Sequence, residues 1–124
     1  DLKVVCRNNN VGILPFYPLN RGLLTDKYSR NAAAPKGTRL GDGGVGTRGV
    51  LSDANFDMVE KLQAFVDQRG RSLLELAMSF LAQQPEIPSV IAGARRPGQA
   101  RENFCLAGWK LSEDDLAELD KLTG

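Results

Sequence analysis

The sequence contains no histidine, and among its 124 residues it has only two cysteines, Cys6 and Cys105. Histidine is the commonest general base and the commonest metal ligand. Its absence therefore excludes Ser-His-Asp and Cys-His nucleophile systems within this chain. Two lone cysteines do not make a disulfide framework, so we expect a reducing compartment, the cytoplasm.

The chain also lacks an excess of charge and a long apolar run. Sixteen Lys and Arg residues stand against fifteen Asp and Glu residues, for a net charge of +1. This balance gives no reason to expect a basic face, so neither nucleic acid nor a membrane is an expected partner. The apolar runs are a few residues long, far short of the ~20 that a bilayer span needs. The composition is that of one ordinary domain, residues 1–124.

Apolar periodicity and capping residues predict five helices. They are expected over 1–9, 53–69, 73–84, 97–107 and from Ser112 onward. Ser72 and Glu75 form the signature of a capping box, and Gly70 is well placed to end the preceding helix. Pro97 lies in the first turn of a helix, where proline is tolerated.

Two short apolar runs, residues 11–17 and 87–92, are predicted to be strands buried on both faces. Pro15 counts against the first, because proline cannot donate to a ladder. Strands that alternate with helices predict an α/β fold with a parallel sheet. Two strands cannot bury both faces of such a sheet, so we expect self-association or membership of a larger barrel.

A long irregular stretch, residues 18–50, follows the first predicted strand. Loops of this length are usually functional. Within it, residues 41–46 match G-x-G-x-x-G literally. That fingerprint requires a strand before it and a helix that starts within it. Neither is expected here, so we interpret residues 41–46 as a flexible loop.

The first candidate binding segment, residues 16–28, begins at the carboxyl end of a predicted strand, the end that carries the active site in α/β barrels. An aromatic side chain such as Phe16 can stack on a flat heterocycle, and loop amides can receive phosphate oxygens. The alternative is structural: the aromatic residues close the top of the barrel, and Leu23 and Leu24 pack beneath the loop.

The second candidate segment, residues 89–104, runs from a predicted strand into a helix that opens at Pro97. A helix amino terminus presents free amides and a positive dipole to an anion. Small residues let the backbone approach closely, and two arginines can add charge-assisted hydrogen bonds. The alternative is a solvated arginine pair on a surface loop. The residues concerned are Gly93, Ala94, Arg95, Arg96, Glu102 and Asn103.

Together, these segments resemble the aldo-keto reductase family. Residues 16–28, FYPLNRGLLTDKY, are similar to its seventh-strand signature, Tyr-Ser-Pro-Leu-x-x-Gly-Leu-Leu-Thr-Gly-Lys-Tyr. Residues 89–104, SVIAGARRPGQARENF, resemble its eighth strand and the NADP-binding turn that follows. Residues 109–116, WKLSEDDL, look like its closing helix. The resemblance implies the carboxy-terminal part of a (β/α)8 TIM barrel, strands 7 and 8 with their helices.

The resemblance also implies NADP as cofactor. It places Phe16 against the nicotinamide, Leu19 and Arg21 along the pyrophosphate, residues 93–96 around the 2′-phosphate, and Glu102 and Asn103 at the adenine. Gln99 stands where many members have arginine, Tyr17 where serine is usual, and Asp26 where glycine is usual. The implied cofactor-binding set is Phe16, Pro18, Leu19, Arg21, Gly93, Ala94, Arg95, Arg96, Gln99, Glu102 and Asn103.

The implied activity is reduction of a small aldehyde or ketone by hydride transfer from NADPH. The family's catalytic Asp, Tyr, Lys and His come from the amino-terminal half and match no position here, so the chain alone is expected to be inactive. The alternative is a catalytically inactive nucleotide-sensing or partner-binding subunit, since some relatives are channel-associated subunits. Without the missing amino-terminal half, the exposed sheet edges predict self-association.

Overall fold

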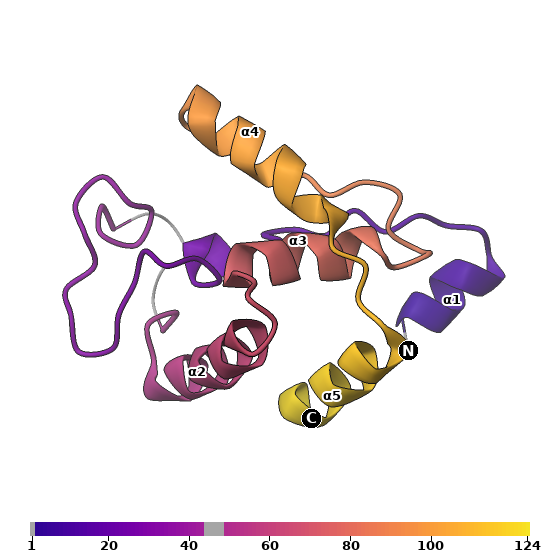
Figure 1. Cartoon of the computed structure of the whole chain (residues 1–124). Coiled ribbons are helices and arrows are strands. Elements are labelled where there is room, and N and C mark those ends of the chain that lie inside the picture. The colour runs from indigo at the N-terminus through magenta and orange to yellow at the C-terminus, as the bar shows by residue number, and fades with distance from the viewer. Residues whose placement is uncertain (1, 44–48) are drawn as a thin grey trace.

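The structure of the chain is a computed structural model that describes residues 2–43 and 49–124. Within these residues all regular structure is helical, and each of the five predicted helices is confirmed (Figure 1). Helices α2, α3 and α4 end two residues earlier than expected. The elements are α1 (Leu2–Asn8), η1 (Asn20–Gly22), α2 (Asp53–Asp67), α3 (Leu73–Ala82), α4 (Pro97–Cys105), η2 (Leu106–Gly108) and α5 (Glu113–Thr123).

Serine side chains start three of the helices, because a serine oxygen can accept from an otherwise unpaired amide of the first turn. Ser52 caps α2. Ser72 accepts from the amide of Glu75 (3.2 Å), whose carboxylate accepts in return from the amide of Ser72 (2.9 Å). Ser112 and Asp115 form the same reciprocal pair at α5. The predicted capping box is therefore confirmed, and a second one starts α5.

The main core lies where α2, α3 and α5 meet. Phe65 and Val66 of α2 are 1% and 0% exposed. Burial of a large apolar side chain contributes about 1.5–3 kcal/mol, so these two positions stabilise the packing of the three helices strongly. The buried cluster consists of Leu62, Phe65, Val66, Leu73, Leu76, Leu111 and Leu119.

Ser79 holds the end of α4 against α3. Its side chain is buried, donates to the carbonyl of Leu106 (3.0 Å) and accepts from the amide of Trp109 (3.1 Å). Gln83 likewise donates to the carbonyl of Leu111 (2.8 Å) and accepts from its amide (2.9 Å). These bonds satisfy the backbone of the connection between α4 and α5. They anchor the carboxyl end of α4 on one side of α3, while α2 and α5 lie on the other (Figure 1).

A smaller core fixes the long loop to α2. Leu23 and Tyr28 from the loop pack with Val50 and Phe56 in a second buried cluster. The guanidinium of Arg30 adds hydrogen bonds to three carboxylates of α2, those of Asp53, Asp57 and Glu60. The loop is therefore irregular, as predicted, but its described part is attached to the helical core.

The prediction of two strands is wrong. In the described residues no strand forms: residues 11–15 and 89–94 have no regular secondary structure, and Pro88 lies in a bend. One backbone bond joins these regions, from the amide of Ile13 to the carbonyl of Glu86 (2.7 Å). A Cβ on Gly12 would lie 2.9 Å from the Pro88 ring, so the two segments run side by side. Pro15 and Pro88 lack the amide donors that a regular ladder needs.

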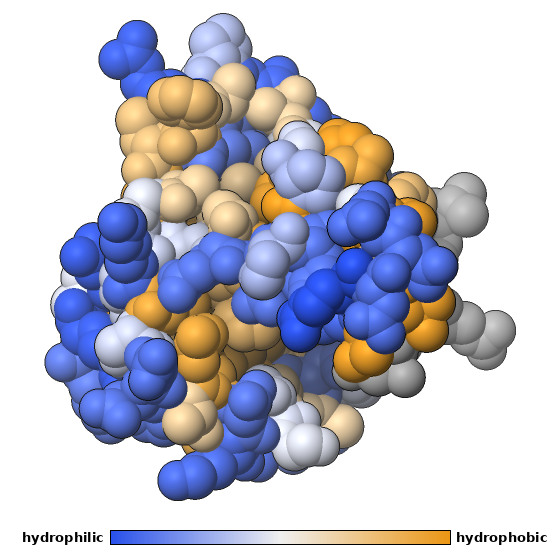
Figure 2. Space-filling model, turned by 90° about the vertical axis from the view of Figure 1, so that its right-hand side faces the viewer, coloured by the Kyte–Doolittle hydropathy of each residue, from blue (hydrophilic) through white to orange (hydrophobic). Residues whose placement is uncertain are grey.

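The predicted burial of these segments is also wrong. Val11, Leu14 and Ile91 are 53%, 57% and 64% exposed. A parallel strand is buried on both faces only when other strands and helices cover it, and none of the described elements does so here. Figure 2 shows the side of the molecule that carries α1, where apolar groups lie among polar ones. Self-association through such residues stays a prediction.

The G-x-G-x-x-G match at 41–46 is only partly described, since residues 44–46 lie outside the described residues. Gly41 and Gly43 are in turns, and the next helix, α2, begins only at Asp53. The structural context of a dinucleotide fingerprint is therefore missing at the described positions.

Asp115 gives the fold a dependence on pH. The amide of Ser112 donates to its carboxylate (2.9 Å) and Arg69 adds an ion pair (2.7 Å), and these effects outweigh burial and lower the pKa of Asp115. A carboxylate with a lowered folded-state pKa stabilises the fold above its unfolded pKa, about 3.9, and this contribution is lost as pH falls through the folded-state value.

We therefore expect Asp115→Asn to lower the free energy of unfolding at pH 7, and to lose less further stability than the unmodified chain on acidification below about pH 4. Urea unfolding, followed by circular dichroism at a series of pH values, measures both effects. Asp114→Asn is the matched control, because Asp114 is an exposed neighbour in the same first turn. Equal losses for the two variants at every pH would contradict the assignment.

Candidate functional site

A pocket of about 620 Å³ lies between the start of the long loop and α4. Six of the eleven residues in the predicted cofactor-binding set line it: Leu19, Gly93, Arg96, Gln99, Glu102 and Asn103. Its volume falls in the range of small-molecule and cofactor sites. Segments more than sixty residues apart in the sequence therefore meet at one concave surface.

Other residues of the lining were missed by the sequence reading. Asp26 and Lys27 lie in the first quoted segment but were given no role, and Ser72 was recognised only as a helix cap. A charged pair next to the family signature was the available signal for the first two. Thr25 and Gly98 also lie within the two candidate segments, whereas no local signal marks Ser72, Leu74 and Leu106, which reach the pocket through the packing of distant elements. The missed residues are Thr25, Asp26, Lys27, Ser72, Leu74, Gly98 and Leu106.

The pocket lies at the amino end of α4, and this end has no side-chain cap. Arg96 occupies the N-cap position without making a capping hydrogen bond, whereas serine side chains cap α2, α3 and α5. The first amides of an α-helix have no partner within the helix. The uncapped end of α4 therefore offers amide donors and the positive end of a helix dipole to an anion in the pocket.

The turn before α4 is held by side chains of α4 itself. The amide of Arg95 donates to the side-chain oxygen of Gln99 (2.9 Å), and the side-chain amide of Asn103 donates to the carbonyl of Gly93 (3.4 Å). Gln99 and Asn103 therefore shape the turn as well as line the pocket. This role was not expected for either residue from the sequence.

The two arginines of the turn diverge. Arg96 lines the pocket. Arg95 instead extends to the long loop, where its guanidinium donates to the carbonyl of Gly37 (3.2 Å) and lies 3.9 Å from the carboxylate of Asp42. Ala94 is exposed and does not line the pocket. The structure thus brings one of the two predicted cations into the pocket and pairs the other with the loop.

Near the pocket, Phe16, Tyr17, Arg21 and Arg39 form a cluster. The rings of Phe16 and Tyr17 lie 3.9 Å apart, and the guanidinium carbons of Arg21 and Arg39 lie 4.3 Å and 5.1 Å from the Tyr17 ring centre. Phe16 is 83% exposed. None of the four, and not Pro18 either, lines the pocket itself. The cluster therefore brings two positive charges against the ring of Tyr17.

The backbone of this cluster is under strain. Tyr17, Asn20 and Arg21 have φ angles of 58°, 43° and 59°, which non-glycine residues seldom adopt. The Nε atom of Arg21 is buried and has no hydrogen-bond partner. Strained backbone and unsatisfied buried donors both cost free energy and often occur at binding sites.

Residues 35–42 of the long loop form a compact turn of their own. Thr38 donates its hydroxyl to the carbonyl of Pro35 (2.6 Å), and the amide of Gly37 donates to Asp42 (2.8 Å). A Cβ on Gly41 would lie 2.0 Å from the carbonyl oxygen of Pro35, so only glycine fits there. This turn presents the two groups that contact Arg95.

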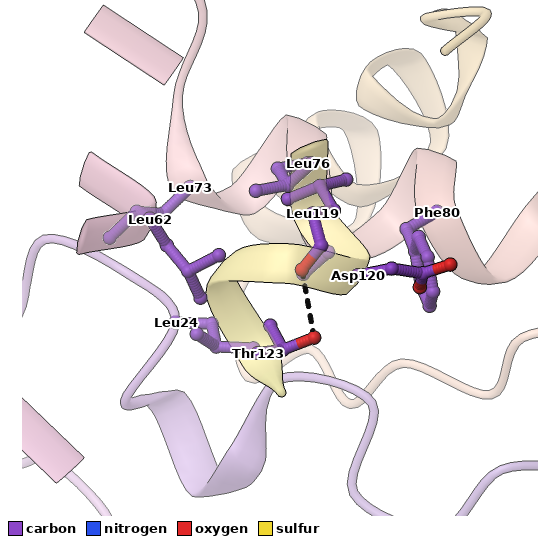
Figure 3. Close-up of a pocket in the computed structure, with 9 residues that line it drawn as sticks. Leu24, Leu62, Leu73, Leu76, Phe80, Leu119, Asp120 and Thr123 are labelled. Carbon is purple, nitrogen blue, oxygen red and sulfur yellow. Dashed lines mark hydrogen bonds between the residues drawn. The ribbon is translucent and has the colours of Figure 1, made fainter. Parts of the chain in front are cut away.

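A second pocket, of about 180 Å³, lies among α2, α3 and α5 (Figure 3). Leucines and Phe80 form most of its wall, with Asp120 and Thr123 at one side. The Thr123 hydroxyl donates to the carbonyl of Leu119 (2.9 Å), so it is satisfied within α5. This pocket is a gap between core side chains and has no convergent polar groups of the kind that binding sites use.

Within residues 2–43 and 49–124, no group of three or more Cys, Asp and Glu side chains could hold a metal ion. Of the helices described, none has the length and apolar character that crossing a membrane requires.

The model of the aldo/keto reductase family matches residues 1–123 of the sequence. The chain belongs to the aldo-keto reductase family. Among solved structures, the chain resembles the glycerol dehydrogenase of Gluconobacter oxydans, with a TM-score of 0.74 and 24% identity over 98% of this chain and 37% of that one. This likeness shows a shared fold, the (β/α)8 barrel of the family.

Three relatives that the chain resembles carry different names. L-glyceraldehyde 3-phosphate reductase of Escherichia coli K12 is 35% identical over 93% of this chain. NADH-specific methylglyoxal reductase of the same strain is 29% identical over 93%. A probable voltage-gated potassium channel subunit beta of Arabidopsis thaliana is 32% identical over 78%. This chain covers 34%, 34% and 30% of these proteins, about a third of their length.

The compact turn at 35–42 is testable through Gly41. We expect Gly41→Ala to open the turn, because the added methyl group collides with the Pro35 carbonyl. Overpacking of this kind costs about 1–3 kcal/mol, which raises the population of the open loop roughly five- to 150-fold. Trypsin should then cleave faster after Lys36 and Arg39.

Gly108→Ala is the matched control, because a Cβ there meets nothing within 4 Å and the backbone is not left-handed. Equal cleavage rates for the unmodified chain and both variants would show that Gly41 is not needed for the turn.

Proposed function

We propose that this chain is the NADP-binding, carboxy-terminal part of an aldo-keto reductase barrel, contributing strands 7 and 8 with their helices. The full protein would reduce an aldehyde or ketone group of a small molecule. The observation that carries the proposal is the pocket at the uncapped end of α4, lined by six residues of the predicted cofactor-binding set. Membership of the family supports the reaction type.

The residues present fit the phosphate groups of a dinucleotide. Arg96 and the first amides of α4 face the pocket and would hold the 2′-phosphate. Arg21 carries a buried donor without a partner beside Tyr17, and a pyrophosphate oxygen would satisfy it. Gly93 leaves the backbone open to close approach, since a Cβ there would meet nothing within 4 Å.

NADPH supplies the hydride when it is bound, and this chain positions it. The exposed face of Phe16 is available for stacking on the nicotinamide ring. Glu102 and Asn103 of α4 also line the pocket, and they would contact the adenine. With no histidine in the chain, we assign the proton transfer to the carbonyl oxygen to residues outside it, and the chain alone should be inactive.

A second candidate function is a nucleotide-sensing or partner-binding subunit that retains the cofactor pocket without turnover. The similarity to a channel subunit beta over 78% of this chain favours it. The pocket residues suit both functions equally well, so they do not distinguish a reductase from a sensing subunit. The tyrosine of the catalytic tetrad, which lies outside this chain, would distinguish them: an intact tyrosine favours the reductase and a substituted one favours the sensing subunit.

We also propose a reducing compartment, the cytoplasm, as the location. Both cysteines are free, Cys6 buried and Cys105 exposed. An exposed free thiol persists most readily in reducing conditions.

The reductase proposal predicts carbonyl-dependent oxidation of NADPH by the full-length protein. Short aldehydes, 2-oxoaldehydes and hydroxyketones form a suitable substrate panel, and the decrease in NADPH absorbance is the readout. NADPH binding without turnover across the panel would contradict the reductase and favour the sensing subunit. No binding of either nicotinamide cofactor would contradict both.

The NADP site is tested by Arg96→Ala. Loss of a charge-assisted hydrogen bond costs about 1.5–3 kcal/mol, so the Kd for NADP should rise about ten- to 150-fold while that for NAD changes little. Cofactor binding is measured by quenching of intrinsic fluorescence. Arg101→Ala is the matched control, because Arg101 is exposed on α4 but does not line the pocket. An unchanged Kd for NADP in Arg96→Ala would remove Arg96 from the site.

A further inference from the structure

We propose that Asp42 weakens the preference of this site for NADP over NAD by competing with the 2′-phosphate of NADP for Arg95. The inference rests on the proposed cofactor site, and it assigns to a residue of the long loop a role in choosing between NADP and NAD. Asp42 lies outside the predicted cofactor-binding set and does not line the pocket.

Arg95 contacts the long loop instead of the pocket. The guanidinium of Arg95 lies 3.9 Å from the Asp42 carboxylate and donates to the carbonyl of Gly37 at 3.2 Å. The adjacent arginine, Arg96, lines the pocket. Neighbouring arginines of one turn therefore face different surroundings, and a loop some fifty residues earlier in the chain causes the difference.

The position of Asp42 is itself fixed. Its other carboxylate oxygen accepts from the amide of Gly37 at 2.8 Å, and its own amide donates to the carbonyl of Thr38 at 3.0 Å. Gly41 permits this turn because a side chain there would collide with Pro35. The carboxylate is therefore held towards Arg95 by the compact turn 35–42, at little further cost in side-chain entropy.

The acidic and basic residues that line the pocket balance one another. Its charged lining residues are Asp26, Lys27, Arg96 and Glu102, two acidic and two basic. This lining has no net charge, so the binding of a phosphate depends on individual contacts, those of Arg96 and of the first amides of α4. Arg95 is the remaining cation of the turn, and Asp42 neutralises it. With Arg95 paired, a 2′-phosphate in the pocket meets one guanidinium of this turn, that of Arg96, instead of two.

If Arg95 were released from Asp42, its guanidinium would add one unpaired positive charge to the site. A 2′-phosphate must therefore displace the carboxylate before it gains the second guanidinium. Two adjacent arginines in the sequence suggest a strong preference for NADP over NAD. The Arg95–Asp42 pair lowers that preference by the free energy of one exposed ion pair.

The test compares two small probes, 2′,5′-ADP and 5′-AMP, which differ in the 2′-phosphate. Asp42→Asn keeps an oxygen that can accept from the Gly37 amide and removes the negative charge. We expect the Kd of the full-length protein for 2′,5′-ADP to fall about two- to fivefold, the size of an exposed ion pair. The Kd for 5′-AMP should not change. Titration calorimetry at low salt measures both.

Two further variants complete the design. Asp114→Asn removes the same charge from α5, on the far side of α3 from α4 (Figure 1), and should change neither Kd. In an Arg95→Ala background, Asp42→Asn should no longer affect the Kd for 2′,5′-ADP, because the coupling between the two side chains is gone.

The outcomes separate the two proposals. If the unmodified protein binds 2′,5′-ADP more tightly than 5′-AMP and Asp42→Asn changes neither Kd, or changes both equally, the role of Asp42 is wrong and the cofactor site stands. If the unmodified protein binds neither probe, the cofactor site fails, and the role of Asp42 fails with it.

Discussion

The burial of Phe65 and Val66 between α2, α3 and α5 is the constraint on which the rest of this structure depends. In the part of the chain that the structure describes, one backbone bond joins the regions predicted as strands, so they do not organise the molecule as a sheet would. The packed helices provide the frame instead. On one side α2 carries the long loop, through Tyr28 and Phe56. On the other, Ser79 of α3 holds the end of α4.

The candidate site follows from these two attachments. The loop is attached to α2 and the end of α4 is attached to α3, so the two sides of the pocket are held by different helices of the core. The turn before α4 contacts the loop through Arg95 and Asp42, and the two sides also meet at the surface lined by Leu19 and Arg96.

Residues from the family motifs line the pocket, and several of them depart from the usual family pattern. The family model covers residues 1–123, and the motifs that carry the resemblance flank the pocket. The charge pattern of the lining is this chain's own. Asp26, which stands where glycine is usual in the signature, places a carboxylate in the pocket. Gln99, which stands where arginine is usual, accepts from the backbone of the turn instead of offering a charge.

Much of the fold could be predicted because helix ends are local. The capping box at Ser72, the cap at Ser112 and the left-handed Gly70 (φ 62°) each depend on residues a few positions apart. The strands could not be predicted correctly, because an apolar run such as 11–17 becomes a strand only when another segment pairs with it. Nor could the sequence show that Ser79 is a buried anchor, since its partners lie 27 and 30 residues away.

The amino-acid sequence by itself determined the family, the five helices and the two segments that approach the pocket. Only the tertiary structure decided that Arg96 faces the pocket while Arg95 turns to Asp42. The physical reason is one of range. Caps and periodic apolar faces are set by neighbours within a turn or two of helix, whereas the partner of an exposed guanidinium is whichever carboxylate or carbonyl the packing of distant segments brings within about 4 Å.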